Sequence, residues 1–323
     1  MDQKTFNTID FNKHFDGVVI LGPTASGKTN LAVQLAAKIN GEIISADSRQ
    51  VYRGMDVGTG KDLEEYYFNG NLIPHHLIDI VDAGDKYNLS CFVKDVSKII
   101  PQIQIRNHIP IICGGTGLYI HTLLQNNAFV HIPNNESLRK ELATKSKFEL
   151  DLIFLEYSKE HFPNADRSTI KRLIRAIEIV DYLTKQNSAP DEESLKPLKA
   201  YVFGVSPEVN MRRSLITNRL KKRLKNGLIE EVETLLGNGI APADLIYYGL
   251  EYKYVTLYLT GNMTEPEMVT KLETEIHRFA KRQMTFFRKM EKDGITIDWL
   301  DNNLSISEKT NYMIEKLKQQ TLN

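Results

Sequence analysis

The octapeptide at residues 22–29 constrains this chain more than any other feature. It reads GPTASGKT, matches G-x-x-x-x-G-K-[ST], and lies between an apolar run at 18–21 and a stretch whose apolar residues have helical spacing. In such a loop, backbone N–H groups surround an anion at a helix N-terminus, a lysine neutralises phosphate charge, and a hydroxyl can ligate Mg²⁺. We therefore predict a P-loop that binds a diphosphate or triphosphate, made of Gly22, Pro23, Thr24, Ala25, Ser26, Gly27, Lys28 and Thr29, with Thr29 as the Mg²⁺ ligand.

Short apolar segments recur after the P-loop, and each ends in a polar or glycine-rich turn. Residues 42–46, 76–81, 109–113 and 200–205 have this character, and the stretches between them can hold helices. Alternation of strands and helices is typical of a doubly wound parallel sheet. We therefore predict an α/β fold in which helices flank a P-loop NTPase-like parallel sheet core.

A helical insertion is predicted to interrupt this core. Stretches containing Pro, Asn and Ser at 126–137 and 187–197 bracket a mainly helical, charge-rich segment. We interpret 1–125 as the first part of the core, 126–197 as the insertion domain, and 198–323 as the rest of the core with C-terminal helices.

Composition limits the classes of protein to which the chain can belong. The 41 Lys and Arg residues balance 41 Asp and Glu residues, so attraction for nucleic acid must come from local clusters. One such cluster is 212–225, which holds seven basic residues and no acid. The two cysteines, Cys91 and Cys113, lack metal-ligand spacing and fit a reducing compartment. Since no apolar run approaches the roughly 20 residues of a membrane span, we expect a cytoplasmic protein without membrane association.

A polar segment follows the second predicted strand, where ligands bind in open α/β sheets. It consists of Asp47, Ser48, Arg49 and Gln50. The Asp47 carboxylate could reach a substrate held beside the phosphates, and a turn or helix-capping carboxylate is the alternative. Residues 77–82 (LIDIVD) also fit, weakly, the apolar strand plus Asp that holds Mg²⁺ in many P-loop proteins.

Further motifs accompany the P-loop along the chain. They are ISADSRQVYRGMDVGTGK at 44–61, HHLIDIVD at 75–82, ICGGTGLYIHTLL at 112–124, RLIRAIEI at 172–179, NGLIEEV at 226–232, FAKRQMTFFR at 279–288 and IDWLD at 297–301. With GPTASGKT they resemble the bacterial type of tRNA dimethylallyltransferases, which move a five-carbon prenyl group onto the N6 amine of an adenosine next to the anticodon. The motifs occur in the family's order and span nearly the whole chain.

The resemblance implies a prenyltransferase that uses dimethylallyl diphosphate, modifies position 37 of tRNA and releases diphosphate. A P-loop that stabilises negative charge on the departing diphosphate would lower the barrier to carbon–oxygen cleavage. By position in the motifs, Asp47 would be the base that takes a proton from the amine, and Thr116 would lie between amine and diphosphate. Arg219 would contact the diphosphate, with Arg223 as the alternative, and Mg²⁺ is the expected cofactor.

The resemblance also assigns the RNA contacts, and it makes the insertion the expected clamp on the tRNA anticodon stem-loop. The implied tRNA-binding residues are Asp47, Ser48, Arg49, Gln50, Thr116, Arg139, Lys171, Arg172, Leu173, Ile174 and Arg175. Tyr247, Tyr248 and Phe286 are candidates for stacking on bases, with core packing as the alternative. The chain departs from the family at Leu250 and Glu251, where an aromatic and then a basic residue are expected. We expect a monomer.

Three other functions use the same features. The first is a P-loop kinase of small molecules or nucleotides whose insertion is an arginine-bearing lid. The second is an isopentenyltransferase that acts on free adenine nucleotides. The third is a nucleotide-dependent RNA-binding module without chemistry.

Overall fold

The computed structural model describes residues 8–125, 128–157, 165–186 and 196–321. These fall into two compact units, one formed by Met1–Leu124 with Leu198–Asn323 and the other by Gln125–Pro197. We call the first the core unit and the second the insertion unit.

A six-stranded parallel sheet forms the centre of the core unit, with the strand order β5-β2-β6-β1-β7-β8. The α/β class predicted from the sequence is confirmed. The apolar strand before the P-loop is central and fully buried. The strands are β1 (Gly17–Leu21), β2 (Gly41–Ser45), β5 (His75–His76), β6 (Ile109–Gly114), β7 (Ala200–Gly204) and β8 (Asp298–Trp299).

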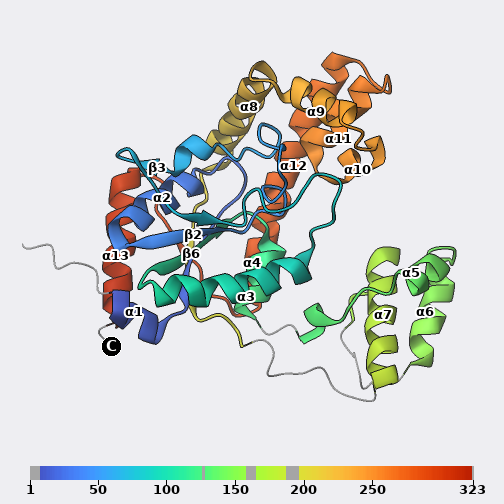
Figure 1. Ribbon diagram of the computed structural model, residues 1–323, viewed down its shortest axis with the longest axis horizontal. Coiled ribbons are helices and arrows are strands. Elements are labelled where there is room, and N and C mark those ends of the chain that lie inside the picture. The colour runs from blue at the N-terminus through green and yellow to red at the C-terminus, as the bar shows by residue number, and fades with distance from the viewer. Residues whose placement is uncertain (1–7, 126–127, 158–164, 187–195, 322–323) are drawn as a thin grey trace, which may run out of the picture. The chain divides into compact units, whose positions relative to one another are not determined.

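Helices cover both faces of this sheet. Figure 1 shows α2 (Lys28–Ile39) and α3 (Leu89–Ile105) on opposite sides of β2 and β6, and α13 (Ile306–Thr321) packs against α2. Side chains alternate between the two faces of β1, and Val18 and Ile20 lie on the same face. Both share a buried cluster with apolar residues of α2 and α13, which therefore cover that face of the sheet. The first helix of the described chain is α1 (Thr8–His14), and α4 (Gly117–Leu124) follows β6.

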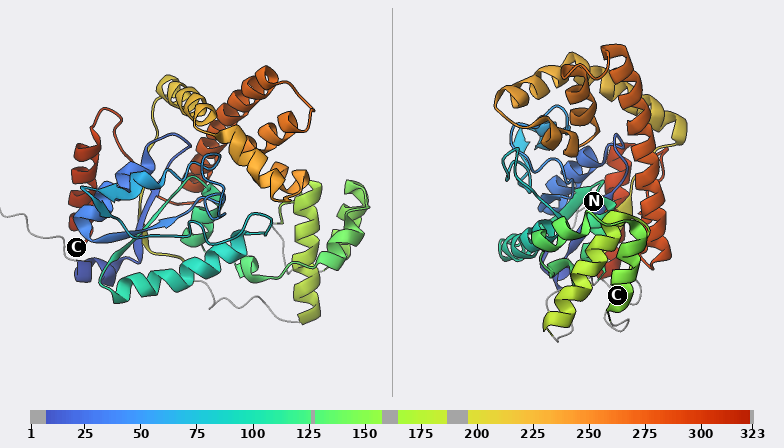
Figure 2. Two further views of the ribbon diagram at one scale, coloured as in Figure 1. Left: turned by 45° about the horizontal axis from the view of Figure 1, so that its top comes forward. Right: turned by 90° about the vertical axis from the view of Figure 1, so that its right-hand side faces the viewer.

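The helices between β7 and β8 gather at one end of the sheet, around the long helix α12 (Glu265–Lys292) (Figure 2). Helix α12 packs against α4, α8 and α11, so it links the sheet to the helical layer. The other helices here are α8 (Val209–Lys225), α9 (Leu228–Gly237), α10 (Pro242–Tyr247) and α11 (Leu250–Leu259).

The predicted strand at 76–81 is wrong beyond its first residue. Only His75–His76 pairs with β2, because Leu77 and Asp79 adopt left-handed backbone conformations (φ 62° and 55°) that end the strand. The chain then continues as a loop, and Val81 forms an isolated bridge to Tyr52. A short hairpin of β3 (Tyr67–Phe68) and β4 (Asn71–Leu72) follows η1 (Leu63–Tyr66), before β5.

The insertion unit is helical. It contains η2 (Ala128–His131), α5 (Glu136–Leu142), α6 (Lys147–Glu156) and α7 (Ile170–Gln186). Helices α5 and α6 both pack on α7, around a cluster formed by Leu142, Leu150, Leu173 and Ile177. In the parts of the chain that the structure describes, none of the helices is long and apolar enough to span a bilayer.

Candidate active site

A cavity of about 400 Å³ opens in the core unit where β1, β2 and β6 end. The P-loop, the segment after β2, the turn after β6, and helices α8, α11 and α12 contribute its wall. Nine of the predicted site residues line it: Thr24, Lys28, Thr29, Asp47, Ser48, Arg49, Gln50, Thr116 and Arg219. The carboxyl ends of parallel strands meet at one edge of a sheet, which is why residues so far apart in sequence converge here.

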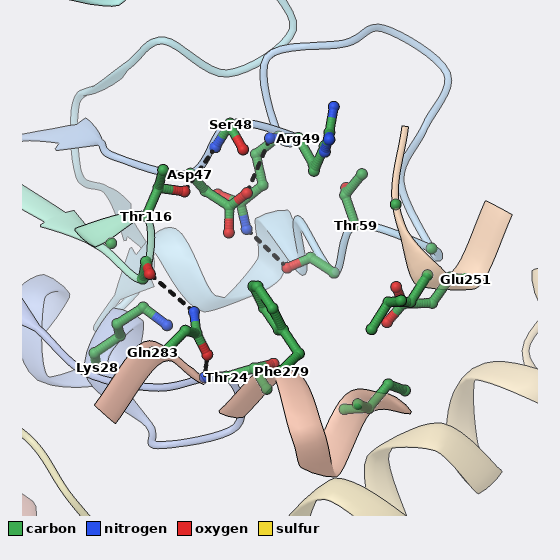
Figure 3. Close-up of a pocket in the computed structure, with 18 of the residues that line it drawn as sticks. Thr24, Lys28, Asp47, Ser48, Arg49, Thr59, Thr116, Glu251, Phe279 and Gln283 are labelled. Carbon is green, nitrogen blue, oxygen red and sulfur yellow. Dashed lines mark hydrogen bonds between the residues drawn. The ribbon is translucent and has the colours of Figure 1, made fainter. Parts of the chain in front are cut away.

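The P-loop joins β1 to α2, with Gly27 in the left-handed conformation (φ 78°) immediately before the helix. Lys28 points into the cavity (Figure 3). Burial lowers the pKa of Lys28, and the nearby Arg219 guanidinium lowers it further, although Cys113 and Asp47 act in the opposite direction. A multiply charged anion between Lys28 and Arg219 would relieve this repulsion, so the electrostatics favour a diphosphate.

Asp47 lies directly opposite the P-loop, and its carboxylate faces the cavity (Figure 3). Its Oδ1 accepts a hydrogen bond from the Arg49 backbone N–H at 2.9 Å, so it also caps the turn. The two readings of this residue from sequence are therefore compatible. The Thr116 Oγ1 accepts from the Ser48 N–H at 3.2 Å, and this bond ties the turn after β6 to the segment after β2.

Gln283 of α12 is a site residue that the sequence reasoning missed. Its Oε1 accepts from the Thr24 N–H of the P-loop, and its Nε2 donates to Gly115 O next to Thr116, both at 2.9 Å (Figure 3). The side chain is buried and bridges the two turns. A signal was present, because Gln283 follows Ile276 and Ala280 on the apolar face of the helix, where a polar residue needs buried partners.

Two arginines of α8, Arg219 and Arg223, line the cavity. The Arg219 Nη2 lies 3.3 Å from Gly60 O and 3.2 Å from the Asp62 carboxylate. The Arg223 Nη1 donates to Gly58 O at 3.2 Å and to Glu251 at 2.9 Å. Of the seven basic residues in 212–225, these two are the ones that line the cavity.

Comparison with known proteins agrees with this geometry. The profile described as IPP transferase matches residues 50–290, and one described as Isopentenyl transferase matches residues 16–70. The chain belongs to the IPP transferase family. The resemblance drawn from the motifs is thereby confirmed.

Relatives match this family member over most of its length. The "tRNA dimethylallyltransferase 2" of Bacteroides fragilis is 52% identical over 94% of this chain and 99% of its own. The crystal structure of the full-length tRNA isopentenylpyrophosphate transferase of Bacillus halodurans is similar at TM-score 0.68 and 32% identity, covering 94% and 97% of the two chains. The corresponding Staphylococcus epidermidis enzyme gives TM-score 0.66 at 30% identity, covering 94% and 98%.

The insertion of this IPP transferase family member places its predicted RNA-contacting residues unevenly. Arg139 and Arg175 turn inward: Arg139 makes two 2.8 Å hydrogen bonds to the buried Glu178, and Arg175 donates to Ile132 O at 2.7 Å. Lys171 and Arg172 are exposed, and Arg172 pairs with Asp166 at 2.9 Å.

Leu173, which is among the residues predicted to contact tRNA, has a buried side chain. Leu173 is fully buried in the cluster between α5, α6 and α7, so its side chain cannot reach a ligand. Ile174 is partly buried against the same cluster. The motif placed both residues beside basic ones, but their side chains lie on the packed face of α7.

The three aromatic candidates differ in exposure. Tyr248 is buried, although it also lines the cavity; its ring is tilted against that of Tyr52 with the ring centres 4.6 Å apart, and its hydroxyl accepts from the Gly84 N–H. Tyr247 is exposed and lies under the Arg49 guanidinium, 5.2 Å from the ring centre. Phe286 lines the cavity.

The metal site suggested at residues 77–82 is not formed. Asp79 pairs with the buried Lys61, and the exposed Asp82 pairs with Arg53 at 2.7 Å. The described residues contain no group of three or more His, Cys, Asp or Glu side chains placed to hold a metal. Thr29 lines the cavity beside Lys28, which fits an ion held mainly by diphosphate oxygens and water.

Proposed function

We propose that this IPP transferase family member transfers a dimethylallyl group from dimethylallyl diphosphate to the N6 amine of the adenosine at position 37 of tRNA, releasing diphosphate. One observation carries the proposal: Lys28 of the P-loop, Arg219 and the Asp47 carboxylate all line a single cavity. The cations suit a leaving diphosphate, and the carboxylate suits the amine that attacks.

The leaving group is assigned to the P-loop side of the cavity. As the carbon–oxygen bond breaks, negative charge grows on the diphosphate, and Lys28 and Arg219 stabilise it. The hydroxyl of Thr116 accepts from the Ser48 N–H, so its own hydrogen is available to a diphosphate oxygen. Thr29 would hold Mg²⁺, which neutralises diphosphate charge when bound.

We assign to Asp47 the role of the base that accepts a proton from the N6 amine. The N6 amine is a weak nucleophile because its lone pair is delocalised into the adenine ring, so loss of a proton during attack lowers the barrier. The amine nitrogen bonds to the allylic carbon, its proton moves to the Asp47 carboxylate, and the diphosphate leaves. The Arg49 N–H bond to Oδ1 keeps the carboxylate in place.

We propose that the protein is a monomer. Its proposed macromolecular partner is the tRNA anticodon stem-loop. Exposed Lys171 and Arg172 on α7 suit phosphate contacts, which position an RNA without reading its sequence. The target base must leave its stack to reach a cavity. A protein acting on tRNA meets it in the cytoplasm, which is the location we propose.

The test is incubation with dimethylallyl diphosphate and undermodified tRNA, followed by nucleoside analysis. We expect N6-prenylated adenosine and released diphosphate. ATP-dependent phosphorylation without prenylated adenosine would indicate a kinase instead. Replacing tRNA by AMP separates the remaining enzymatic alternative, because efficient prenylation of AMP would contradict an RNA acceptor.

A further inference from the structure

A carboxylate outside the cavity binds the backbone of the loop at 56–60, and this loop contacts both cavity arginines. Glu231, in the first turn of α9, accepts hydrogen bonds from three consecutive backbone N–H groups: those of Asp56 and Val57 at 2.7 Å and that of Gly58 at 2.9 Å. The Tyr252 hydroxyl donates a fourth at 2.7 Å. Glu231 is not among the described residues that line the cavity.

The loop at 56–60 is in direct contact with the two cavity arginines. Gly58 O accepts from Arg223, and Gly60 O accepts from Arg219 at 3.3 Å and from the Gln50 side chain at 3.1 Å. At Gly60 the fit leaves no space for a side chain, because a Cβ would lie 1.8 Å and 2.1 Å from the two guanidinium groups. Movement of this loop therefore moves the groups that orient both arginines.

The three backbone N–H groups that Glu231 binds favour a negatively charged partner. Three N–H groups that point to one side make a concave site of positive partial charge. A carboxylate accepts up to about four hydrogen bonds, whereas an amide would turn an NH₂ group toward at least one of these donors. Four charge-assisted bonds also make this attachment stronger than the single bonds around it.

A second charged group holds the same loop from within. The ammonium of Lys61 is buried and donates to Tyr52 O and to the Asp56 carboxylate at 2.7 Å, besides pairing with Asp79. The loop is thus fixed from α9 by an anion and from its own end by a cation, which leaves its carbonyls little freedom.

We infer, on the basis of the proposed role of Arg219 toward the diphosphate, that Glu231 is a positioning residue for prenyl transfer. It holds the backbone of 56–58, so that the carbonyls of Gly58 and Gly60 direct Arg223 and Arg219 into the cavity. It touches no substrate. Its effect should therefore fall on the prenyl donor and pass through Arg219.

The experiment compares Glu231→Gln with Glu230→Gln, a neighbour in the same turn that is exposed. Binding of inorganic pyrophosphate is measured by calorimetry, and KM is measured for dimethylallyl diphosphate and for tRNA. For Glu231→Gln we expect pyrophosphate affinity to weaken and the donor KM to rise by about tenfold, the scale of one charged hydrogen bond. The KM for tRNA should stay unchanged, and Glu230→Gln should match the parent protein in all three.

A double-mutant cycle distinguishes positioning from general support. If Glu231 acts through Arg219, Glu231→Gln should cost clearly less pyrophosphate affinity in an Arg219→Ala background than alone. Equal losses in both backgrounds, or a lowered Tm with unchanged pyrophosphate affinity, would overturn the inference. If Glu231→Gln does not fold, Tyr252→Phe serves instead, because it removes one of the four hydrogen bonds to Glu231. It should weaken pyrophosphate binding by roughly twofold to threefold. Unchanged pyrophosphate binding in Tyr252→Phe would contradict the positioning role of Glu231.

Pyrophosphate binding also separates this inference from the proposed function. Should the parent protein form no prenylated adenosine while Glu231→Gln still weakens pyrophosphate binding, the proposed reaction fails and the positioning role stands. Should prenylation proceed normally in Glu231→Gln, the positioning role fails and the reaction stands.

Discussion

The core unit and the insertion unit both set arginines beside carboxylates, but the pairs differ in burial. Arg219 in the core unit has the carboxylate of Asp62 beside it, and that side chain is 55% exposed. Arg139 and Arg175 in the insertion unit share Glu178, whose side chain is 0% exposed. A water-screened pair is weak and yields to a ligand, whereas a buried pair holds its partners. Arginines that look alike in sequence therefore differ in the structure: Arg219 has a screened partner, whereas Arg139 and Arg175 are held by a buried one.

The largest effect should come from the carboxylate on the cavity wall. Asp47→Asn removes the proposed base but keeps a hydrogen-bond acceptor for the Arg49 N–H, so we expect kcat to fall by about 1000-fold. The affinity for tRNA should stay within about twofold, and filter binding with single-turnover prenylation measures both. Asp82→Asn, which alters an exposed carboxylate outside the cavity, is the matched control. Unchanged turnover in Asp47→Asn would remove Asp47 from the reaction.

Replacing Arg219, whose partner carboxylate is exposed, should have the next largest effect. Arg219→Ala deletes the cation proposed to face the developing diphosphate charge, and we expect a loss of kcat of about 100-fold. Arg213→Ala changes an exposed arginine of the same helix and should leave kcat near that of the parent protein. If the two substitutions had similar effects, the contrast between the arginines of α8 would be lost.

Disrupting the buried pair should change stability instead of chemistry. Glu178→Gln removes the buried countercharge that Arg139 and Arg175 share, and we expect the insertion unit to lose about 2 kcal/mol. Hydrogen exchange of the α7 amides measures this loss. Pyrophosphate affinity should not change, and the exposed Glu136→Gln on α5 should behave like the parent protein. Unaltered exchange in Glu178→Gln would contradict a structural role.

The smallest effect is expected on the exposed basic surface of the insertion unit. Replacing Lys171 and Arg172 together by Ala should weaken tRNA binding by several-fold and reduce the slope of log affinity against log salt by about 2, one for each lost phosphate contact. The donor KM should stay the same. Lys185→Ala, at the other end of α7, serves as the control. A full salt slope in the double variant would place the RNA elsewhere.

Local patterns predicted the elements whose cause is local. The P-loop, the strand before it and the helix after it follow from a short motif and the periodicity of apolar residues. The segment at 76–81 shows the limit of this approach. It is a short apolar segment, as a buried strand would be, but the left-handed conformations of Leu77 and Asp79 turn it into a loop. A short apolar run does not by itself report backbone pairing.

Gln283 and Glu231 illustrate what sequence reasoning could not place. Each acts through backbone groups of a distant segment: Gln283 through Thr24 and Gly115, and Glu231 through the loop at 56–58. Backbone N–H and C=O groups carry no mark in a sequence, because every residue except proline has both. Their partners can be identified only when the fold brings them together.

The sequence by itself determined the phosphate-binding loop, the parallel α/β core and, through the order of its motifs, the family. Those features depend on residue identity at fixed spacing, which a linear chain preserves. Only the tertiary structure decided which arginines face the cavity, which are neutralised by Glu178, and which loop contacts Arg219 and Arg223. These outcomes depend on burial and on hydrogen bonds between residues as far apart as Gly60 and Arg219, and both arise only when the chain is packed.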